Sequence, residues 1–182
     1  MPRLYLVRHG RPAALSTQSE DAGLDPIGVA QAEAMAEGLG PLGPLPIIVS
    51  PLRRTRETAT PLERRWGAAR VEPAVGEIPW PPGVRLATRG EWLRKIMASR
   101  WEDVPPELHV WRDAVIAALL GLSASTVVVS HFVAINAALG AATASDHVIS
   151  FSPDHCSVTV LEVDRGRLVL VERGAEAATR VM

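Results

Sequence analysis

The chain has 182 residues, 47% of them apolar, which suits one domain with a sizeable hydrophobic core and argues against disorder. Its 19 Lys and Arg nearly balance 20 Asp and Glu, so no strongly basic face is expected and nucleic acid is not a favoured partner. Cys156 is the only cysteine, which excludes an intrachain disulfide and a cysteine-based zinc site.

The start of the chain carries no recognisable targeting signal, because Arg8 and His9 interrupt the only apolar stretch there. No segment approaches the length needed to cross a bilayer. We therefore expect a cytoplasmic protein without a membrane partner. The sequence leaves the oligomeric state open, and a homodimer is compatible with it.

The first predicted element is a buried strand at residues 4–7, because a short apolar run bounded by turn residues is typical of a strand in a parallel sheet. Arg8 and His9 follow it directly, at the end of the strand where open α/β sheets place their ligand sites. An isolated Arg-His-Gly at a strand end is more often simply solvated, so the interpretation depends on the rest of the chain.

A helix is predicted to begin at Asp25-Pro26, with Asp25 as its N-cap and Pro26 as its first residue. Apolar side chains recur at about 3.6-residue spacing and predict a buried face. That face consists of Ile27, Ala30, Ala34, Met35 and Leu39. Glycines and prolines at residues 40–46 end the helix.

A second buried strand at residues 47–49 passes directly into a helix, for which Ser50 is the predicted N-cap and Pro51 a first-turn residue. The start of a helix offers free amide groups and a positive dipole end, both of which suit an anion. Three arginines follow: Arg53, Arg54 and Arg56. They cannot all face the same way on a helix, so we expect one of them to point toward a site at the strand end.

The middle of the chain is predicted to be less regular. A weak strand at residues 70–72 precedes a proline-rich stretch at 73–83, which cannot be helical. Helical sequence then runs from about residue 91 to 122, with a break at 104–106.

The clearest strand lies at residues 126–129 and is followed by His131 and an apolar helix at 132–139. Apolar runs at 157–163 and 168–171 flank a turn-forming Asp-Arg-Gly and predict a hairpin. Polar, chemically capable residues thus follow three of the predicted strands, which indicates a common site at one edge of the sheet.

Four separated segments resemble, in order, motifs of the histidine phosphatase superfamily (phosphoglycerate mutase-like). Residues 6–10, Leu-Val-Arg-His-Gly, match the family's nucleophile motif, and residues 24–32 resemble the L-T-x-x-G-x-x-Q-A helix that follows it. Residues 50–59 are similar to S-P-L-x-R-A-x-Q-T-A, which puts the family's arginine on Arg54. Residues 129–131 resemble the late V-S-H motif.

The fold implied by this resemblance is a three-layer α/β/α domain with a mostly parallel central sheet, phosphoglycerate mutase-like. The alternation of strands and helices along the chain points the same way. One such domain would span residues 1–182, with a small helical and loop cap at about 80–111. The final hairpin is expected at one edge of the sheet, with its last strand antiparallel.

The resemblance also implies roles for five residues. His9 would attack phosphorus and become phosphohistidine. Arg8, Arg54 and His131 would surround the phosphoryl oxygens, with His131 as the second catalytic histidine. Glu77 would protonate the leaving oxygen and later activate water. No cofactor is implied, and the sequence has no cluster at metal-ligand spacing.

Two departures from the family pattern bear on these roles. Residues 78–83 lack the Gly-x-Trp-Glu-Gly that usually follows the family's acid, so Glu72 and Glu91 remain alternatives to Glu77. Residues 11–15 replace the Glu-Ser-x-Trp-Asn of the mutases, whose polar side chains help to hold phosphate and substrate. This second departure favours hydrolysis over phosphotransfer.

We therefore predict a metal-independent phosphomonoesterase, a hydrolase of the histidine acid phosphatase type, that acts on a small-molecule phosphoester through phosphohistidine at His9. Arg11, Trp80 and His155 are the candidate substrate contacts. Three alternatives remain: a phosphoglycerate-mutase-type phosphotransferase, a protein phosphohistidine phosphatase, and a catalytically silent phosphate-binding module.

Overall fold

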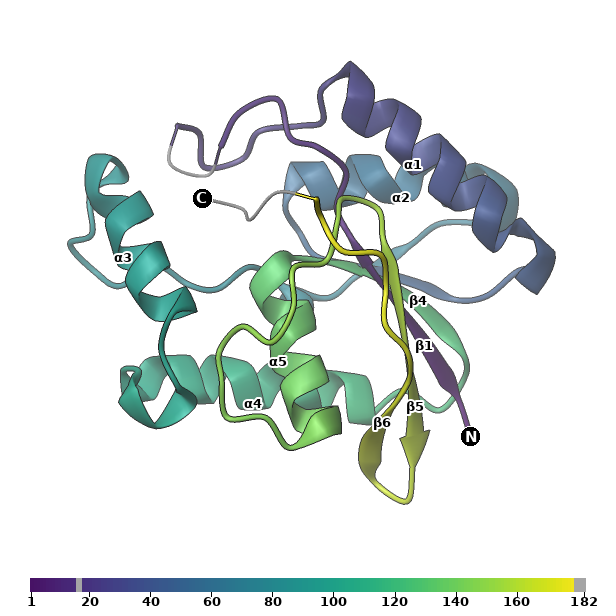
Figure 1. Ribbon diagram of the computed structural model, residues 1–182. Helices are drawn as coiled ribbons and strands as arrows, with labels where there is room; N and C mark the ends of the chain where they lie inside the picture. Colours follow the sequence, from purple (N-terminus) through teal and green to yellow (C-terminus); the bar gives the residue numbers. More distant parts are fainter. Residues whose placement is uncertain (16–17, 179–182) are drawn as a thin grey trace.

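The computed structural model describes residues 1–15 and 18–178, and within them one six-stranded sheet forms the centre of the protein (Figure 1). The strand order across this sheet is β3-β2-β4-β1-β5-β6. The strands are β1 (Arg3–Arg8), β2 (Ile47–Val49), β3 (Arg70–Val71), β4 (Thr126–Ser130), β5 (Val158–Asp164) and β6 (Arg167–Glu172). Each predicted strand is therefore present within about a residue of its expected bounds.

Strands β3, β2, β4 and β1 pair in parallel, and β5 pairs antiparallel with β1. β6 pairs antiparallel with β5 and forms the outer edge. The mostly parallel sheet and the terminal hairpin are confirmed. The strand that opposes the others is β5, one place in from the edge. Because the tight turn after Asp164 reverses the chain, β6 runs in the same direction as β1.

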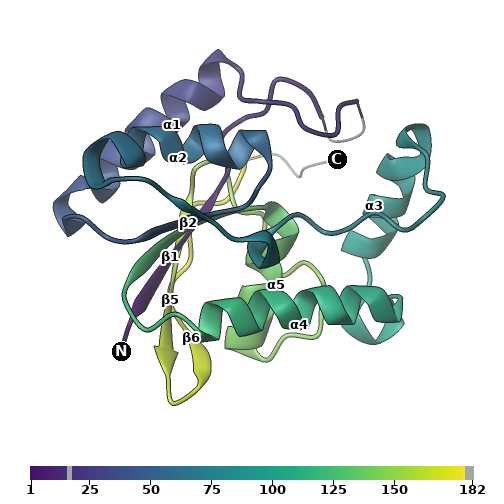
Figure 2. The ribbon, with the colours of Figure 1, turned by 180° about the vertical axis from the view of Figure 1, so that it is seen from behind.

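Helices cover both faces of the sheet, as expected for three layers (Figures 1 and 2). In β4, Val127 and Val129 pack among residues of α1 and α2, whereas Val128 packs among residues of α4 and α5. The α-helices are α1 (Pro26–Leu39), α2 (Arg53–Trp66), α3 (Arg89–Met97), α4 (Pro106–Leu120) and α5 (Phe132–Thr143). Short 3-10 helices lie at Gly40–Leu42, Pro73–Val75, Leu86–Thr88 and Trp101–Asp103.

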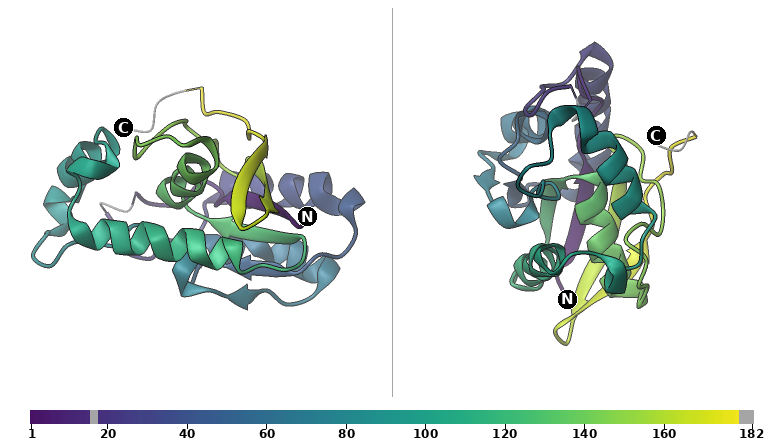
Figure 3. Two further views of the ribbon diagram at one scale, coloured as in Figure 1. Left: turned by 90° about the horizontal axis from the view of Figure 1, so that it is seen from below. Right: turned by 90° about the vertical axis from the view of Figure 1, so that its left-hand side faces the viewer.

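Helix α3 lies beyond the carboxyl ends of the strands rather than against either face of the sheet (Figure 3). It is held by the Arg89 guanidinium, which lies 4.9 Å above the Trp80 ring and donates to Glu20 at 2.7 Å. The Trp80 and Trp92 rings also pack at 5.3 Å between centroids. These contacts join α3 to the loop after β1 and the loop after β3.

The start of α1 follows the prediction, since the Asp25 carboxylate accepts a hydrogen bond from the Gly28 amide at 2.7 Å. The prediction of which residues form the buried face of α1 is partly wrong. Met35 and Leu39 are buried, but Ile27, Ala30 and Ala34 are exposed. Gly28 explains the difference, because it packs so closely on the backbone of Arg11 that a Cβ there would lie 2.2 Å from the Arg11 carbonyl oxygen. This contact turns Ala32 and Ala36 toward the sheet instead.

Two further predictions about helices need correction. Helix α2 begins at Arg53 with Leu52 as its N-cap, so Ser50 does not cap it. The hydroxyl of Ser50 instead contacts a histidine on a different segment, as described below. The predicted helical stretch at 91–122 is two helices, α3 and α4, separated by residues 98–105 rather than by a short break. Across residues 1–15 and 18–178, no helix combines the length and apolar character that spanning a membrane requires.

Candidate active site

The site lies where neighbouring parallel strands end. Arg8 pairs in register with Ser130, so the next residues, His9 and His131, leave adjacent strands side by side. Arg54 lies in the first turn of α2, directly after β2, which neighbours β4. The sheet order therefore brings together residues from three distant parts of the sequence.

Arg54 is the centre of this group. Its Nε lies 3.3 Å from His9 Nε2, and its Nη2 lies 3.4 Å from His131 Nδ1. The same Nη2 donates to Glu77 Oε2 at 3.2 Å. The arginine assigned from the sequence, Arg54 rather than Arg53, is thus the one that reaches the strand ends, while Arg53 pairs with Glu57 at 2.6 Å.

His9 is held as a neutral imidazole with a defined tautomer. Its Nδ1 lies 2.8 Å from the Gly10 carbonyl oxygen, which only accepts hydrogen bonds, so Nδ1 carries the proton. Nε2 is left with a lone pair. Burial, followed by the neighbouring His131 and Arg54, lowers the pKa of His9 well below its ordinary value of 6.5. That lone pair accepts a hydrogen bond from Arg54 Nε at 3.3 Å, and a neutral imidazole becomes a competent nucleophile at physiological pH when a bound phosphate takes over this donor.

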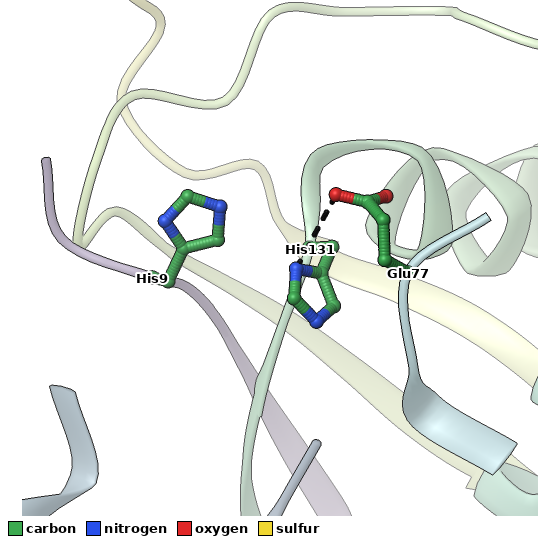
Figure 4. A group of neighbouring side chains, drawn as sticks. All are labelled: His9, Glu77 and His131. Carbon is green, nitrogen blue, oxygen red and sulfur yellow. Dashed lines mark ion pairs between the residues drawn. The ribbon is translucent and has the colours of Figure 1, made fainter. Parts of the chain in front are cut away.

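His131 is also neutral, because burial and the Arg54 and Arg8 cations lower its pKa well below 6.5. Its Nε2 lies 2.7 Å from the hydroxyl of Ser50. Its Nδ1 lies 3.4 Å from Glu77 Oε2, the contact marked in Figure 4. A serine hydroxyl can donate or accept, so this contact holds the orientation of the ring and turns Nδ1 toward Glu77 and the site.

Glu77 stands opposite His9 in this group, as Figure 4 shows. Burial raises the pKa of its carboxyl, although Arg54 and the Ile78 amide act in the opposite direction. The alternative carboxylates are placed elsewhere. Glu72 accepts from Arg70 at 2.7 Å and from the Ala74 amide at 3.2 Å. Glu91 is exposed in the first turn of α3.

Arg8 is buried, with 5% of its surface exposed. Its Nη1 donates to the Pro153 carbonyl at 2.8 Å, and the guanidinium lies 5.0 Å from the centre of the Phe132 ring. Among the described residues its Nε finds no hydrogen-bond partner. Burial lowers the pKa of Arg8 to about 10, so the side chain remains a cation at physiological pH. A buried cation with an unused donor suits an anionic ligand.

His9, Glu77 and His131 also form the group whose geometry comes nearest to a metal site, because one ligand atom from each lies within 4.8 Å of the others. The guanidinium of Arg54, however, contacts all three of these residues at 3.2–3.4 Å. A metal dication in the same place would be repelled by this buried cation. The charge of the site therefore favours an anion.

The group opens into a cavity of about 360 Å³. Arg11 and His155, two of the candidate substrate contacts, line it. Trp80 instead lines a neighbouring cavity of about 380 Å³, where it stacks under Arg89. Sequence reasoning missed the contact of Ser50 with His131 and the apolar walls that α3 and α5 give to the cavity.

Comparison with protein families places these features in a known group. Residues 4–176 match the model of the histidine phosphatase superfamily (branch 1). The chain therefore belongs to the histidine phosphatase superfamily. No curated protein matched the sequence in a separate comparison.

Solved structures with the same fold include several phosphatases. The phosphoserine phosphatase of Entamoeba histolytica, in complex with 3-phosphoglyceric acid, is 20% identical, with 98% of each chain covered and a TM-score of 0.76. A mycobacterial glucosyl-3-phosphoglycerate phosphatase in complex with VO3 is 23% identical over 97% of this chain and 100% of the other, with a TM-score of 0.72. A putative alpha-ribazole-5'-P phosphatase of Escherichia coli is 19% identical over 98% and 100%, with a TM-score of 0.76.

Proposed function

We propose that the protein is a phosphate monoester hydrolase that works through a phosphohistidine on His9. The observation that carries the proposal is the position of Arg54, which donates hydrogen bonds to both Nε2 of His9 and the carboxylate of Glu77. A phosphoryl group bound by this guanidinium would have a nucleophile on one side and a proton donor on the other. The similar solved structures, described as phosphatases of phosphoserine, of glucosyl-3-phosphoglycerate and, putatively, of alpha-ribazole-5'-P, support the same assignment.

Binding of the phosphate dianion is the first step. Arg8 and Arg54 supply two buried cations, and Nδ1 of His131 faces the same site. Arg54 must then share its donors between the phosphate and Glu77, which weakens its pull on the carboxylate. The nearby dianion also raises the pKa of Glu77 further, because like charges disfavour ionisation. Substrate binding therefore favours the protonated form of Glu77.

Transfer of the phosphoryl group to His9 follows, with the nucleophile and the leaving oxygen on opposite sides of phosphorus. The lone pair of His9 Nε2 forms a bond to phosphorus as the bond from phosphorus to the ester oxygen breaks. Glu77 gives its proton to that oxygen, so an alcohol leaves rather than an alkoxide. Arg8, Arg54 and His131 stabilise the charge on the three remaining oxygens.

Water completes the cycle. The Glu77 carboxylate takes a proton from a water molecule, whose oxygen attacks phosphorus while the bond to Nε2 breaks. Inorganic phosphate leaves, and His9 returns to its neutral form. Glu77 ends protonated, ready for another ester. No step in this scheme requires a metal ion, and its need for a protonated Glu77 predicts that transfer to His9 slows as the pH rises through the raised pKa of Glu77.

We further propose that residues 1–182 act as a single cytoplasmic domain in which the segment 80–111 covers the site. Two observations support the cover. Leu93 and Met97 of α3 line the cavity in front of His9. The stacking of Arg89 on Trp80 fixes α3 in this position.

Phosphate release tests the proposal. Wild-type protein, His9→Ala and the control His147→Ala would be assayed with a panel of phosphate monoesters in the presence of EDTA. His147 is exposed, so its loss leaves the site intact. We expect EDTA-resistant release from wild type and His147→Ala and none from His9→Ala. Release by His9→Ala equal to wild type would contradict the proposal.

A further inference from the structure

The cavity in front of His9 has two chemically different ends. Arg8, Arg54, His9 and Glu77 form the end where the phosphoryl group would bind. Beyond them the wall is built mainly from apolar side chains: Ala14, Leu15, Leu93, Met97, Phe132 and Val133. This second end would surround the alcohol part of a bound ester.

The apolar wall comes from three separate segments. Leu93 and Met97 are four residues apart on α3, so they share one helix face. Phe132 and Val133 begin α5 on the other side of the cavity. Leu15 belongs to the loop after β1, lines the cavity and is 56% exposed. A large apolar side chain exposed at the wall of a cavity is a ready contact for an apolar ligand.

The polar groups at this second end are a paired cation and a neutral ring. Nε of Arg11 pairs with Asp25 at 2.5 Å, which offsets the charge of the guanidinium within the protein. Burial, followed by the charge of Arg8, lowers the pKa of His155 to about 4, which leaves its ring neutral at physiological pH. Along the described wall, a substrate carboxylate would therefore meet no unbalanced cation beyond the phosphate-binding arginines.

We infer that the substrate is the phosphate monoester of an apolar alcohol, aliphatic or aromatic, rather than of a sugar acid or amino acid. The inference rests on the proposed function and names the substrate class of the same site. A carboxylate or several hydroxyls held against this wall would lose water without gaining partners, which is costly. The cavity volume of about 360 Å³ is near the lower end for ligand pockets, so the alcohol is small, on the scale of one ring or a short chain.

A homologous series tests the inference. The n-alkyl phosphates from ethyl to octyl phosphate have leaving groups of nearly equal basicity, so differences in kcat/KM report contacts with the alkyl chain. Each methylene that enters the apolar end should raise kcat/KM about three- to fourfold until the cavity is full. 3-Phosphoglycerate should fall below ethyl phosphate. A flat series, or a preference for 3-phosphoglycerate, would overturn the inference.

Variants of α3 test whether this helix produces the dependence of kcat/KM on chain length. Met97→Gln replaces an apolar side chain by a polar one of similar length, and it should reduce the hexyl-to-ethyl ratio of kcat/KM about tenfold. Lys95→Gln is the matched control, because Lys95 is exposed on the same helix. An unchanged ratio in Met97→Gln would assign the chain-length effect to another surface and contradict the inference.

A binding measurement tests the apolar pocket independently of the proposed hydrolase activity. The affinity of His9→Ala for the same alkyl phosphates, measured by calorimetry, does not depend on turnover. Binding that tightens with chain length, together with inactive wild-type protein, would support the apolar pocket and contradict the hydrolase. Turnover without any chain-length dependence in binding would support the hydrolase and contradict the apolar pocket.

Discussion

The hydroxyl of Ser50 lies 2.7 Å from Nε2 of His131, two residues that are 81 positions apart in the sequence. This contact occupies one nitrogen of the imidazole and directs the other, Nδ1, toward Glu77 and the site. Ser50 therefore holds the orientation of the His131 ring relative to a bound phosphate. It is a positioning residue, because it acts through the histidine.

Ser50→Ala removes this hydrogen-bond partner of the His131 ring. We expect kcat to fall about tenfold to a hundredfold, since the imidazole is then no longer held in place beside the phosphoryl oxygens. KM should change much less than kcat. Ser130→Ala is the matched control, because Ser130 is equally buried but donates to the Val75 carbonyl at 2.7 Å. Equal kinetic losses in the two variants would show that Ser50 acts only through packing.

Arg54 and Arg53 offer a test of which arginine binds phosphate. Arg54→Lys removes the branched donor that contacts both His9 and Glu77, and we expect kcat/KM to fall a hundredfold or more. Arg53→Lys alters an exposed side chain paired with Glu57 and should remain near wild type. Steady-state kinetics with one ester distinguishes the two arginines. A larger loss of kcat/KM in Arg53→Lys than in Arg54→Lys would contradict the assignment of phosphate binding to Arg54.

Glu77 as proton donor predicts a dependence on the leaving group. Glu77→Gln should lower kcat for an alkyl phosphate by about a hundredfold or more, because the alkoxide needs a proton as it leaves. The loss should be much smaller with p-nitrophenyl phosphate, whose leaving group is stable as an anion. Glu72→Gln and Glu91→Gln serve as controls. An equal loss of kcat with both substrates would show that Glu77 is not the proton donor to the leaving group.

Stability should depend on pH through the histidines of the site. The pKa of His155 falls from 6.5 to about 4 on folding, so its contribution is complete above pH 6.5 and is lost as the pH falls toward 4. His9 and His131 act in the same direction. The raised pKa of Glu77 acts in the opposite one, since its contribution is complete below 4.5 and is lost as the pH rises through its folded pKa.

Urea unfolding of wild type and His155→Gln isolates the contribution of His155, because Glu77 is common to both proteins. The free energy of unfolding should decrease less in His155→Gln than in wild type between about pH 7 and about pH 5. His147→Gln, an exposed histidine, should follow wild type. Free energies of unfolding that change equally with pH in wild type and His155→Gln would contradict the lowered pKa of His155.

Much of the site could be predicted because its parts follow strands. Apolar runs before His9 and His131 predict buried strands, and adjacent parallel strands deliver the residues after them to one edge of the sheet. Ser50 was misassigned as a helix cap because its hydroxyl has its partner on another strand, which local sequence does not reveal. The buried face of α1 was displaced by the contact between Gly28 and Arg11, another long-range feature.

The residues that line the cavity could not be predicted from the sequence either. Leu93 and Met97 lie on a helix that packs away from the sheet, so periodicity alone gave no reason to place them near His9. Trp80 lies against the Arg89 guanidinium and lines the neighbouring cavity, to which Arg54 and Glu77 also contribute, so its contact with substrate stays a prediction. Such contacts depend on how α3 docks, and that is decided by tertiary packing.

The most direct test of the account is to trap the covalent intermediate. Wild-type protein would be mixed with a reactive phosphate ester and quenched in alkali, in which phosphohistidine survives, and its peptides analysed by mass spectrometry. The account predicts one added phosphoryl group on the peptide that contains His9, and none in His9→Ala. Turnover by wild type without a phosphoryl group on His9, or with one on another residue, would contradict it.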